Sequence, residues 1–122
     1  MAKKEPLATQ EELKKLIQSI KNLQCELFNH YKEKEKIKKE LEIVELDILN
    51  SIRSELDENL KPRFSNDDKR KLELYHREVN DSLYLSKLTS LNDILKTINN
   101  MEISLEENRL TFRMHEILSR IS

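Results

Sequence analysis

The sequence predicts an all-α protein, and three features of its composition lead to that prediction. The chain of 122 residues contains no glycine and only two prolines, Pro6 and Pro62. Glycine supplies the tight turns of β-rich and α/β folds and the close backbone approach of phosphate-binding loops. Charged residues make up 37% of the chain and aromatic residues only 5%. Such a chain can bury only a thin apolar seam, so we expect one domain of long helices with few turns.

The first helix is expected to run from about residue 10 to 60, after a flexible tail at residues 1–8. Thr9 and Glu12 form a capping box, which marks a helix start. Apolar residues then recur at alternating intervals of three and four, the heptad pattern of a helix that packs along one stripe. The predicted seam consists of Leu13, Leu16, Ile20, Leu23, Leu27, His30, Lys34, Ile37, Leu41, Val44 and Ile48.

One interruption lies in this seam, at the run KEKEK of residues 32–36. Two interpretations compete: a polar layer that fixes the register of a continuous helix, or a bend that divides the helix into two halves. The continuous helix is favoured because Lys and Glu are good helix formers and no helix breaker is present.

A turn at residues 61–65 is expected to lead into a second helix from about 66 to 121. Pro62 stops the first helix, and Ser65 with Asp68 resembles a capping box for the second. The predicted seam of this helix follows Leu72, Tyr75, Val79, Leu83, Leu88, Leu91, Leu95 and Ile98. A break near Asn99 would create a short third helix from about residue 104; the unbroken helix is favoured because Asn is tolerated within helices.

Two helices of similar length joined by a short turn predict a long, coiled-coil-like antiparallel helical hairpin. The fold then pairs each residue i with roughly residue 127 − i. This pairing brings two wide apolar segments together, and a two-helix hairpin cannot cover both flanks of such a surface. We therefore expect a homodimer or higher homo-oligomer, most simply a four-helix bundle. This apolar belt comprises Leu41, Ile43, Val44, Leu46, Ile48, Leu49, Leu83, Tyr84 and Leu85.

A basic cluster surrounds the predicted turn and gives the alternative function, binding of nucleic acid by a small accessory protein. Lysine and arginine would contact phosphates, and an exposed phenylalanine could stack on a base. The simpler interpretation, which we favour, is a solvated helix start whose cations balance the acidic residues 54–58. This basic tip consists of Lys61, Arg63, Phe64, Lys69, Arg70 and Lys71.

The C-terminal stretch offers a further apolar set with two interpretations. It could form a docking face for a partner protein, or it could pack on the first turns of the first helix, and the pairing rule favours packing. The set consists of Leu105, Leu110, Phe112, Met114, Ile117 and Leu118.

No catalytic, cofactor-binding or metal-ligating residues are predicted. The three histidines are not spaced at helical intervals from one another or from a cysteine, as a metal site on a helix would need. Glu73 and His76 resemble half of a di-metal carboxylate motif, and the chain contains no second copy, although a homodimer could supply one by symmetry. A metal-dependent helical-bundle enzyme is therefore a third, weaker interpretation, and a surface Glu–His pair is favoured. Cys25 is the only cysteine, and we expect a reduced thiol on the polar side of its helix.

These observations predict a non-enzymatic structural or protein-interaction module that acts as a self-associating helical hairpin. Its partners would be copies of itself and another protein. The N-terminal residues lack the apolar stretch of a secretion signal, and no segment has the length and apolarity of a membrane span, so a cytoplasmic protein is expected.

Overall fold

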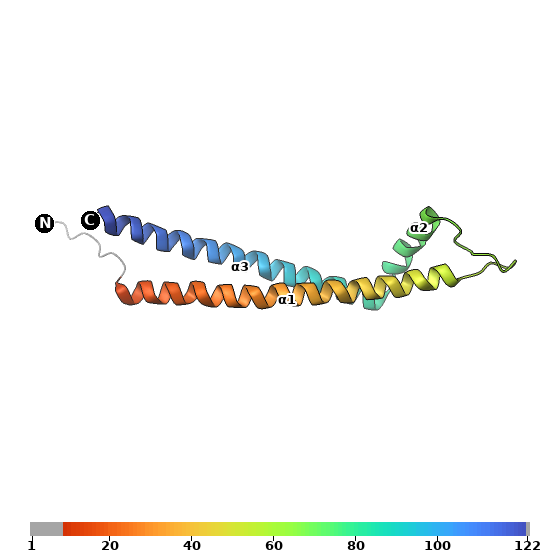
Figure 1. Ribbon diagram of the computed structural model, residues 1–122, viewed down its shortest axis with the longest axis horizontal. Helices are drawn as coiled ribbons and strands as arrows, with labels where there is room; N and C mark the ends of the chain where they lie inside the picture. The colour runs from red at the N-terminus through yellow and green to blue at the C-terminus, as the bar shows by residue number, and fades with distance from the viewer. Residues whose placement is uncertain (1–8, 122) are drawn as a thin grey trace. The chain divides into compact units, whose positions relative to one another are not determined.

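The computed structural model describes residues 9–121 and confirms the all-α class (Figure 1). It contains the helices α1 (Gln10–Ser54), α2 (Asp67–Glu78) and α3 (Ser82–Ile121). Within this described range no strand is formed, and the β-type pairing is a single antiparallel bridge between Leu56 and Pro62. The tail predicted at residues 1–8 lies outside the described residues.

The chain divides into two compact units, and α1 and α3 each contribute to both. The terminal unit contains the described residues 9–32 and 96–121, and the loop unit contains residues 33–95. Along α1 the boundary falls inside the run KEKEK. The helix itself continues through this run without a break, as predicted, because every residue there favours helix.

The start of α1 and its seam are confirmed. The Glu12 backbone N–H donates to Thr9 Oγ1 at 3.2 Å, and the Thr9 N–H donates to Glu12 Oε2 at 3.3 Å, so the capping box is complete. Every residue of the predicted α1 seam is buried or half-buried, including the polar His30 and Lys34. Among them Leu27, Ile37, Leu41 and Val44 are at most 9% exposed.

The first helix ends at Ser54, six residues earlier than its predicted end near residue 60. The reason is the side chain of Asp57, whose Oδ1 accepts the backbone N–H groups of Asn59 at 2.8 Å and Lys61 at 3.0 Å. An aspartate that binds nearby backbone donors offers the chain an alternative to helix. Leu60 then adopts a left-handed conformation with φ 60°, so the loop extends over residues 55–66 and not over 61–65.

The predicted second helix is two helices, α2 and α3, and the break lies at residues 79–81 and not near Asn99. Asn66, one residue after the predicted Ser65, caps α2 by accepting the Lys69 N–H at 2.9 Å. Asp81 caps α3, since its Oδ1 accepts the Tyr84 N–H at 2.7 Å. The helix α3 continues through residues 99–104, so no separate helix begins there.

The seam of α3 also differs from the prediction, because α3 starts afresh at Ser82 and does not continue the phase of α2. Five residues of the predicted seam are exposed: Leu72, Tyr75, Val79, Leu83 and Leu95. The other three, Leu88, Leu91 and Ile98, are buried or half-buried as predicted. Apart from Leu88, the buried and half-buried residues of α3 recur at heptad spacing: Tyr84, Lys87, Leu91, Ile94, Ile98, Met101, Leu105, Asn108, Phe112 and His115.

Each unit shows how its own segments pair. In the terminal unit Leu27 shares a groove with Leu105, and Leu13 shares one with Phe112, so the two segments run in opposite directions. In the loop unit Lys87 Nζ donates to Glu40 Oε2 at 2.5 Å, which is the pairing that the 127 − i rule gives. In the terminal unit the agreement varies: Leu13 lies beside Phe112, close to the residue 114 that the rule gives, whereas Tyr31 bonds to Glu102 and not near residue 96.

Candidate interaction surfaces

The structure divides the predicted apolar belt into a buried and an exposed part. Leu41 and Val44 belong to the seam of α1 and are 9% exposed. Ile43 and Leu46 lie on the outside of α1 and are 59% and 54% exposed. On α3, Leu83 and Leu85 are exposed. The remaining belt residues, Ile48, Leu49 and Tyr84, are half-buried.

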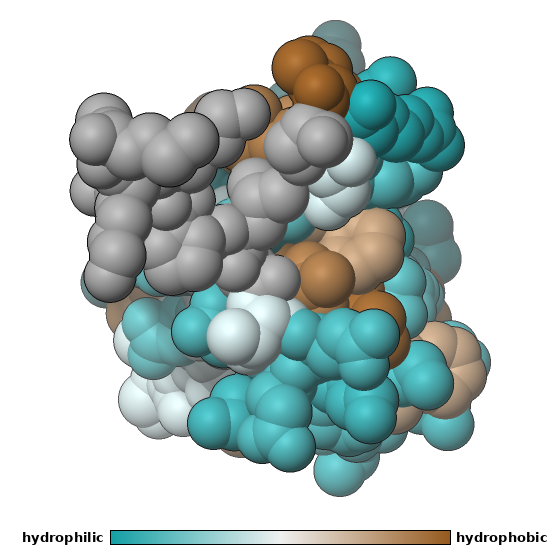
Figure 2. All heavy atoms as spheres, turned by 90° about the vertical axis from the view of Figure 1, so that its left-hand side faces the viewer, coloured by the Kyte–Doolittle hydropathy of each residue, from teal (hydrophilic) through white to brown (hydrophobic). Residues whose placement is uncertain are grey.

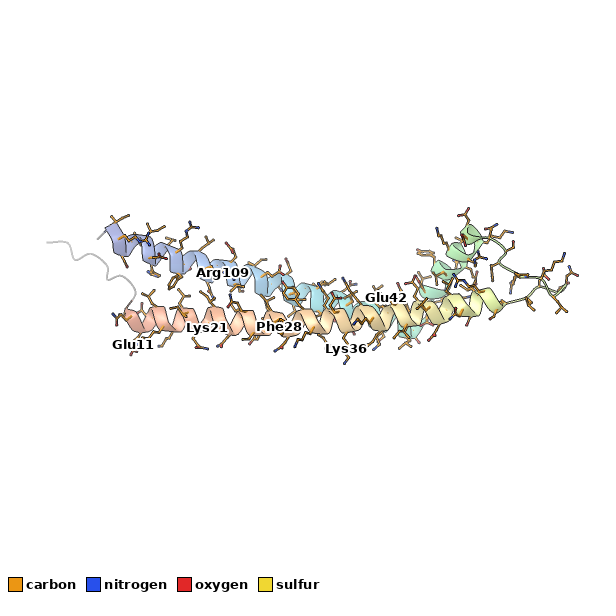
Figure 3. The ribbon with its side chains drawn as sticks, in the orientation of Figure 1. Glu11, Lys21, Phe28, Lys36, Glu42 and Arg109 are labelled. Atoms are coloured by element: carbon orange, nitrogen blue, oxygen red, sulfur yellow. The ribbon has the colours of Figure 1, made fainter. Side chains whose placement is uncertain are left out.

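The exposed part of the belt on α1 borders a shallow groove. Glu42, Glu45, Leu46 and Leu49 line it, so two carboxylates flank two leucines. Figure 3 labels Glu42 on this part of α1. A helix that docked here would bury the leucines and could place cations beside the two carboxylates.

A third carboxylate, that of Glu78 on α2, lies near Glu45 of this groove. Burial is the main reason that the pKa of Glu78 is raised, and the nearby Glu45 adds to the effect. The hydroxyl of Tyr84 donates to Glu78, which partly offsets this rise. Burial likewise raises the pKa of Tyr84, with Glu78 as a further cause. Tyr84 is thus held within the loop unit by its own chain.

The basic tip is brought together, but its arginines are engaged with acidic groups. Arg63 Nη1 donates to Glu55 Oε1 at 2.9 Å, and Arg70 Nη2 donates to Asp67 Oδ1 at 2.5 Å. Arg70 also donates to the Phe64 carbonyl at 3.1 Å. The lysines of the tip, Lys61, Lys69 and Lys71, are exposed.

Phe64 is not the exposed stacking platform that the sequence suggested. Its side chain is half-buried, and the guanidinium groups of Arg63 and Arg77 lie 5.5 Å and 5.8 Å from its ring centroid. Both distances suit cation–π attraction. The ring therefore joins the polar network of the loop unit, which leaves less of its face for a nucleic-acid base.

Glu55 is the centre of that network, and it is one of the acidic residues 54–58 that were expected from the sequence to balance the basic tip. It accepts hydrogen bonds from both Arg77 and Arg63. Arg77 also donates to Glu73 at 2.8 Å, so one guanidinium joins two carboxylates. The hydrogen bond from Arg77 is the main cause that holds the pKa of Glu55 below its usual value. The sequence feature that could have predicted these ion pairs was the position of Glu55 at the end of α1, opposite a basic stretch.

An apolar groove in the terminal unit was not predicted. Its volume is about 470 Å³, and buried Leu27 and Leu105 form its floor. Figure 3 labels Phe28 on α1 and Arg109 on α3, two of its lining residues. Phe28 is 59% exposed, and Lys32 Nζ lies 4.4 Å from its ring centroid. The Tyr31 hydroxyl donates to Glu102, and this bond raises the pKa of the tyrosine.

The C-terminal apolar set is split between two sides of α3. Leu105 and Phe112 are buried and half-buried, as the packing interpretation predicts. Leu110, Met114, Ile117 and Leu118 are instead 51%, 61%, 47% and 44% exposed. Figure 2 views the molecule along its long axis from the end where the C-terminus lies, and it shows apolar side chains both in the middle and at the outer edge of this face.

The structure brings no metal-ligating or catalytic set together in the part of the chain that it describes. No group of three His, Cys, Asp or Glu side chains is placed to hold a metal ion among residues 9–121. Glu73, the first residue of the di-metal half-motif, forms an ion pair with Arg77. Cys25 is an exposed free thiol, as its place on the polar side of α1 predicts.

Comparisons with protein-family models, with curated proteins and with solved structures yield no match. Among the described residues, no helix combines the length and the apolarity that crossing a bilayer requires.

Proposed function

We propose that this protein is a non-enzymatic structural and interaction module: a long antiparallel helical hairpin that self-associates, most simply as two hairpins in a four-helix bundle. One observation carries the proposal. The belt contains apolar side chains that the chain's own packing leaves exposed, Ile43 and Leu46 on α1 and Leu83 and Leu85 on α3. Ile43 and Leu46 are three residues apart and share one face of α1, and exposed apolar side chains that lie together typically mark an interaction surface.

The heptad spacing of α1 and α3 supports the proposal that the partner is also helical. The buried positions of α1 and α3 follow heptad spacing, the pattern that packs helix against helix. A second copy would present the same belt, so a two-fold symmetric contact would bury both copies of each leucine.

The test is the solution mass by light scattering after gel filtration, over a range of concentrations. The wild type is expected at a multiple of 14.6 kDa. A double variant, Ile43→Glu with Leu46→Glu, is expected to lower that mass, because a buried carboxylate without a partner is costly. Lys38→Glu is the matched control, since Lys38 is an exposed, polar residue of the same helix. A wild type that stays monomeric at every concentration would refute the proposal.

A nucleic-acid-binding accessory protein is the second candidate, and the exposed Lys61, Lys69 and Lys71 favour it. Binding through these lysines would weaken steeply with added salt, because each phosphate contact releases counterions. Replacing all three by Glu should abolish a shift of DNA or RNA in a native gel. If the wild type shifts neither nucleic acid at low salt, this candidate fails.

A further inference from the structure

The C-terminal part of α3 carries apolar side chains on two opposite sides. One side is the seam described above. Each of three exposed residues follows a seam residue by two positions: Leu110 follows Asn108, Met114 follows Phe112, and Ile117 follows His115. Two residues correspond to about 200° around a helix, so the exposed residues lie opposite the seam. We call this set the outer stripe; it comprises Ile103, Leu110, Met114, Ile117 and Ile121, which are 47–78% exposed.

The outer stripe has its own heptad spacing. Its residues follow one another at intervals of seven, four, three and four, and Glu107 occupies the position that the first interval skips. A stripe of this kind fits the side chains of another helix, knob into hole, along its length. The occupant it calls for is therefore a helix with the same repeat. The outer stripe of a second copy of α3 has that repeat.

The charges beside the outer stripe favour an antiparallel pair. In a parallel pair, Glu107 would face Glu107 of the second copy, and this repulsion would fall within the apolar contact. In the antiparallel register that sets Met114 against Leu110 and Ile121 against Ile103, the two Glu107 side chains are separated. The same register brings Glu106 near Arg120 of the second copy, twice, which adds attraction at the edges. The register has two unfavourable contacts: the two copies of Arg113 face each other, and each Glu107 lies against Ile117 of the second copy.

We propose that the outer stripe of α3 pairs antiparallel with the outer stripe of α3 in a second copy of this chain. This pairing rests on the proposed function in one respect, that the chain self-associates, and it uses a surface other than the belt. With two symmetric surfaces, each chain can contact two neighbours, so assembly can proceed beyond a dimer.

The mass experiment separates the two surfaces. In the belt variant, Ile43→Glu with Leu46→Glu, the outer stripe is intact, and we expect a dimer of twice 14.6 kDa. Adding Leu110→Glu and Ile117→Glu should halve that mass, whereas adding Arg109→Glu, beside the stripe, should leave it unchanged. Circular dichroism shows whether each variant keeps its helices.

The outcomes are distinguishable. A belt variant that is already a helical monomer would overturn the outer-stripe contact and leave the proposed function standing. A belt variant with the mass of the wild type, which becomes monomeric only when the outer stripe is changed, would support the stripe and remove the belt. If the outer-stripe substitutions leave the mass unchanged, the inference is wrong.

Orientation is tested by disulfide formation in a Cys25→Ser background, which removes the natural thiol. Chains with Ile103→Cys and chains with Ile121→Cys are mixed and oxidised. The antiparallel pair predicts mixed disulfides between the two kinds of chain, in large excess over those between identical chains. Arg109→Cys, mixed with either, is the control and should not cross-link. Disulfides only between identical chains would overturn the antiparallel arrangement.

Discussion

The two compact units stabilise their helix pairs in different ways. In the terminal unit the helices meet through a seam with three well-buried residues, Leu27, Ile98 and Leu105, and the hydrogen bond from Tyr31 to Glu102 links the two segments. The loop unit buries three seam residues of α1 together with Ile52, and adds ion pairs between its elements, from Glu40 to Lys87 and from Glu55 to Arg77. The terminal unit is thus held together mainly by apolar packing. The loop unit combines apolar packing with ion pairs between its elements.

This difference bears on where a partner would bind. The terminal unit leaves the outer stripe of α3 and the groove beside Phe28 exposed, so a further helix would complete its packing. In the loop unit, side chains such as Tyr84 and Phe64 are already engaged by the chain itself. Its exposed apolar side chains include Ile43 and Leu46 on the outer side of α1 and Leu83 and Leu85 on α3.

The largest expected effect comes from the core of the loop unit. Ile52 is the most buried of the described side chains, at 0% exposed. Ile52→Ala should lower the free energy of unfolding by about 3 kcal/mol, since removing buried methyl groups costs both transfer energy and a cavity. Urea denaturation followed by circular dichroism measures this loss. Ile17→Ala, at an exposed position of the same helix outside the belt, is the control and should cost under about 1 kcal/mol. Equal losses would show that Ile52 is not a core residue.

The next largest effect is a gain in stability from a substitution in the seam of the terminal unit. His115 is half-buried in that seam, and its Nδ1 is buried without a hydrogen-bond partner. An unsatisfied buried polar atom is costly, so His115→Leu should raise the free energy of unfolding by about 1 kcal/mol. His76→Leu, at an exposed position of α2, should change little in the same denaturation experiment. A loss of stability in His115→Leu would mean that the imidazole makes a stabilising interaction in the folded protein.

The sequence predicted the part of this fold that depends on periodicity within one helix. The α1 seam from Leu13 to Ile48 keeps its heptad spacing through the polar residues His30 and Lys34, and the structure buries or half-buries all of it. It did not predict helix ends set by single side chains. Asp57 and Asp81 each bind backbone N–H groups, and neither needs a glycine or proline to mark the place.

Periodicity alone also could not divide the C-terminal apolar residues. Leu105 and Phe112 follow one heptad pattern and Ile103 and Leu110 follow another, within the same turns of α3. Either pattern could face α1, and the choice depends on tertiary packing. The tip shows the same limit: Arg63 and Phe64 were correctly expected near the turn, but their engagement with Glu55 and Arg77 needs the loop's path.

A smaller effect is expected in the loop of residues 55–66. Leu60 has φ 60°, a conformation that costs most residues about 1–2 kcal/mol and that asparagine tolerates better. Its side chain is 79% exposed, so little packing would be lost. Leu60→Asn should therefore raise the free energy of unfolding by roughly 0.5 kcal/mol. Leu56→Asn, in the same loop, is the control and should give no gain. If the Leu60→Asn variant is less stable than the wild type, the Leu60 side chain makes stabilising apolar contacts.

The smallest effects are electrostatic, and two glutamates of the loop unit should give opposite signs. The pKa of Glu55 is lowered by its hydrogen bond from Arg77, so the folded state binds protons less readily than the unfolded state does. Its contribution to stability is therefore present above the unfolded pKa of about 4.3 and is lost as the pH falls through the lower folded value. The pKa of Glu78 is raised, first by burial, so its contribution is present below about pH 4.3 and is lost as the pH rises through the folded value.

Matched substitutions separate these two signs. Glu55→Gln should lower the urea midpoint at pH 7 and have little effect near pH 2, where the carboxyl of the wild type is protonated in both states. Glu78→Gln should raise the midpoint at pH 7, because it removes a half-buried charge beside Glu45, and should have little effect near pH 2. If both variants shifted the urea midpoint in the same direction at pH 7, the charges of Glu55 and Glu78 would not determine the stability of the loop unit. The contrast between the two units would then rest on packing alone.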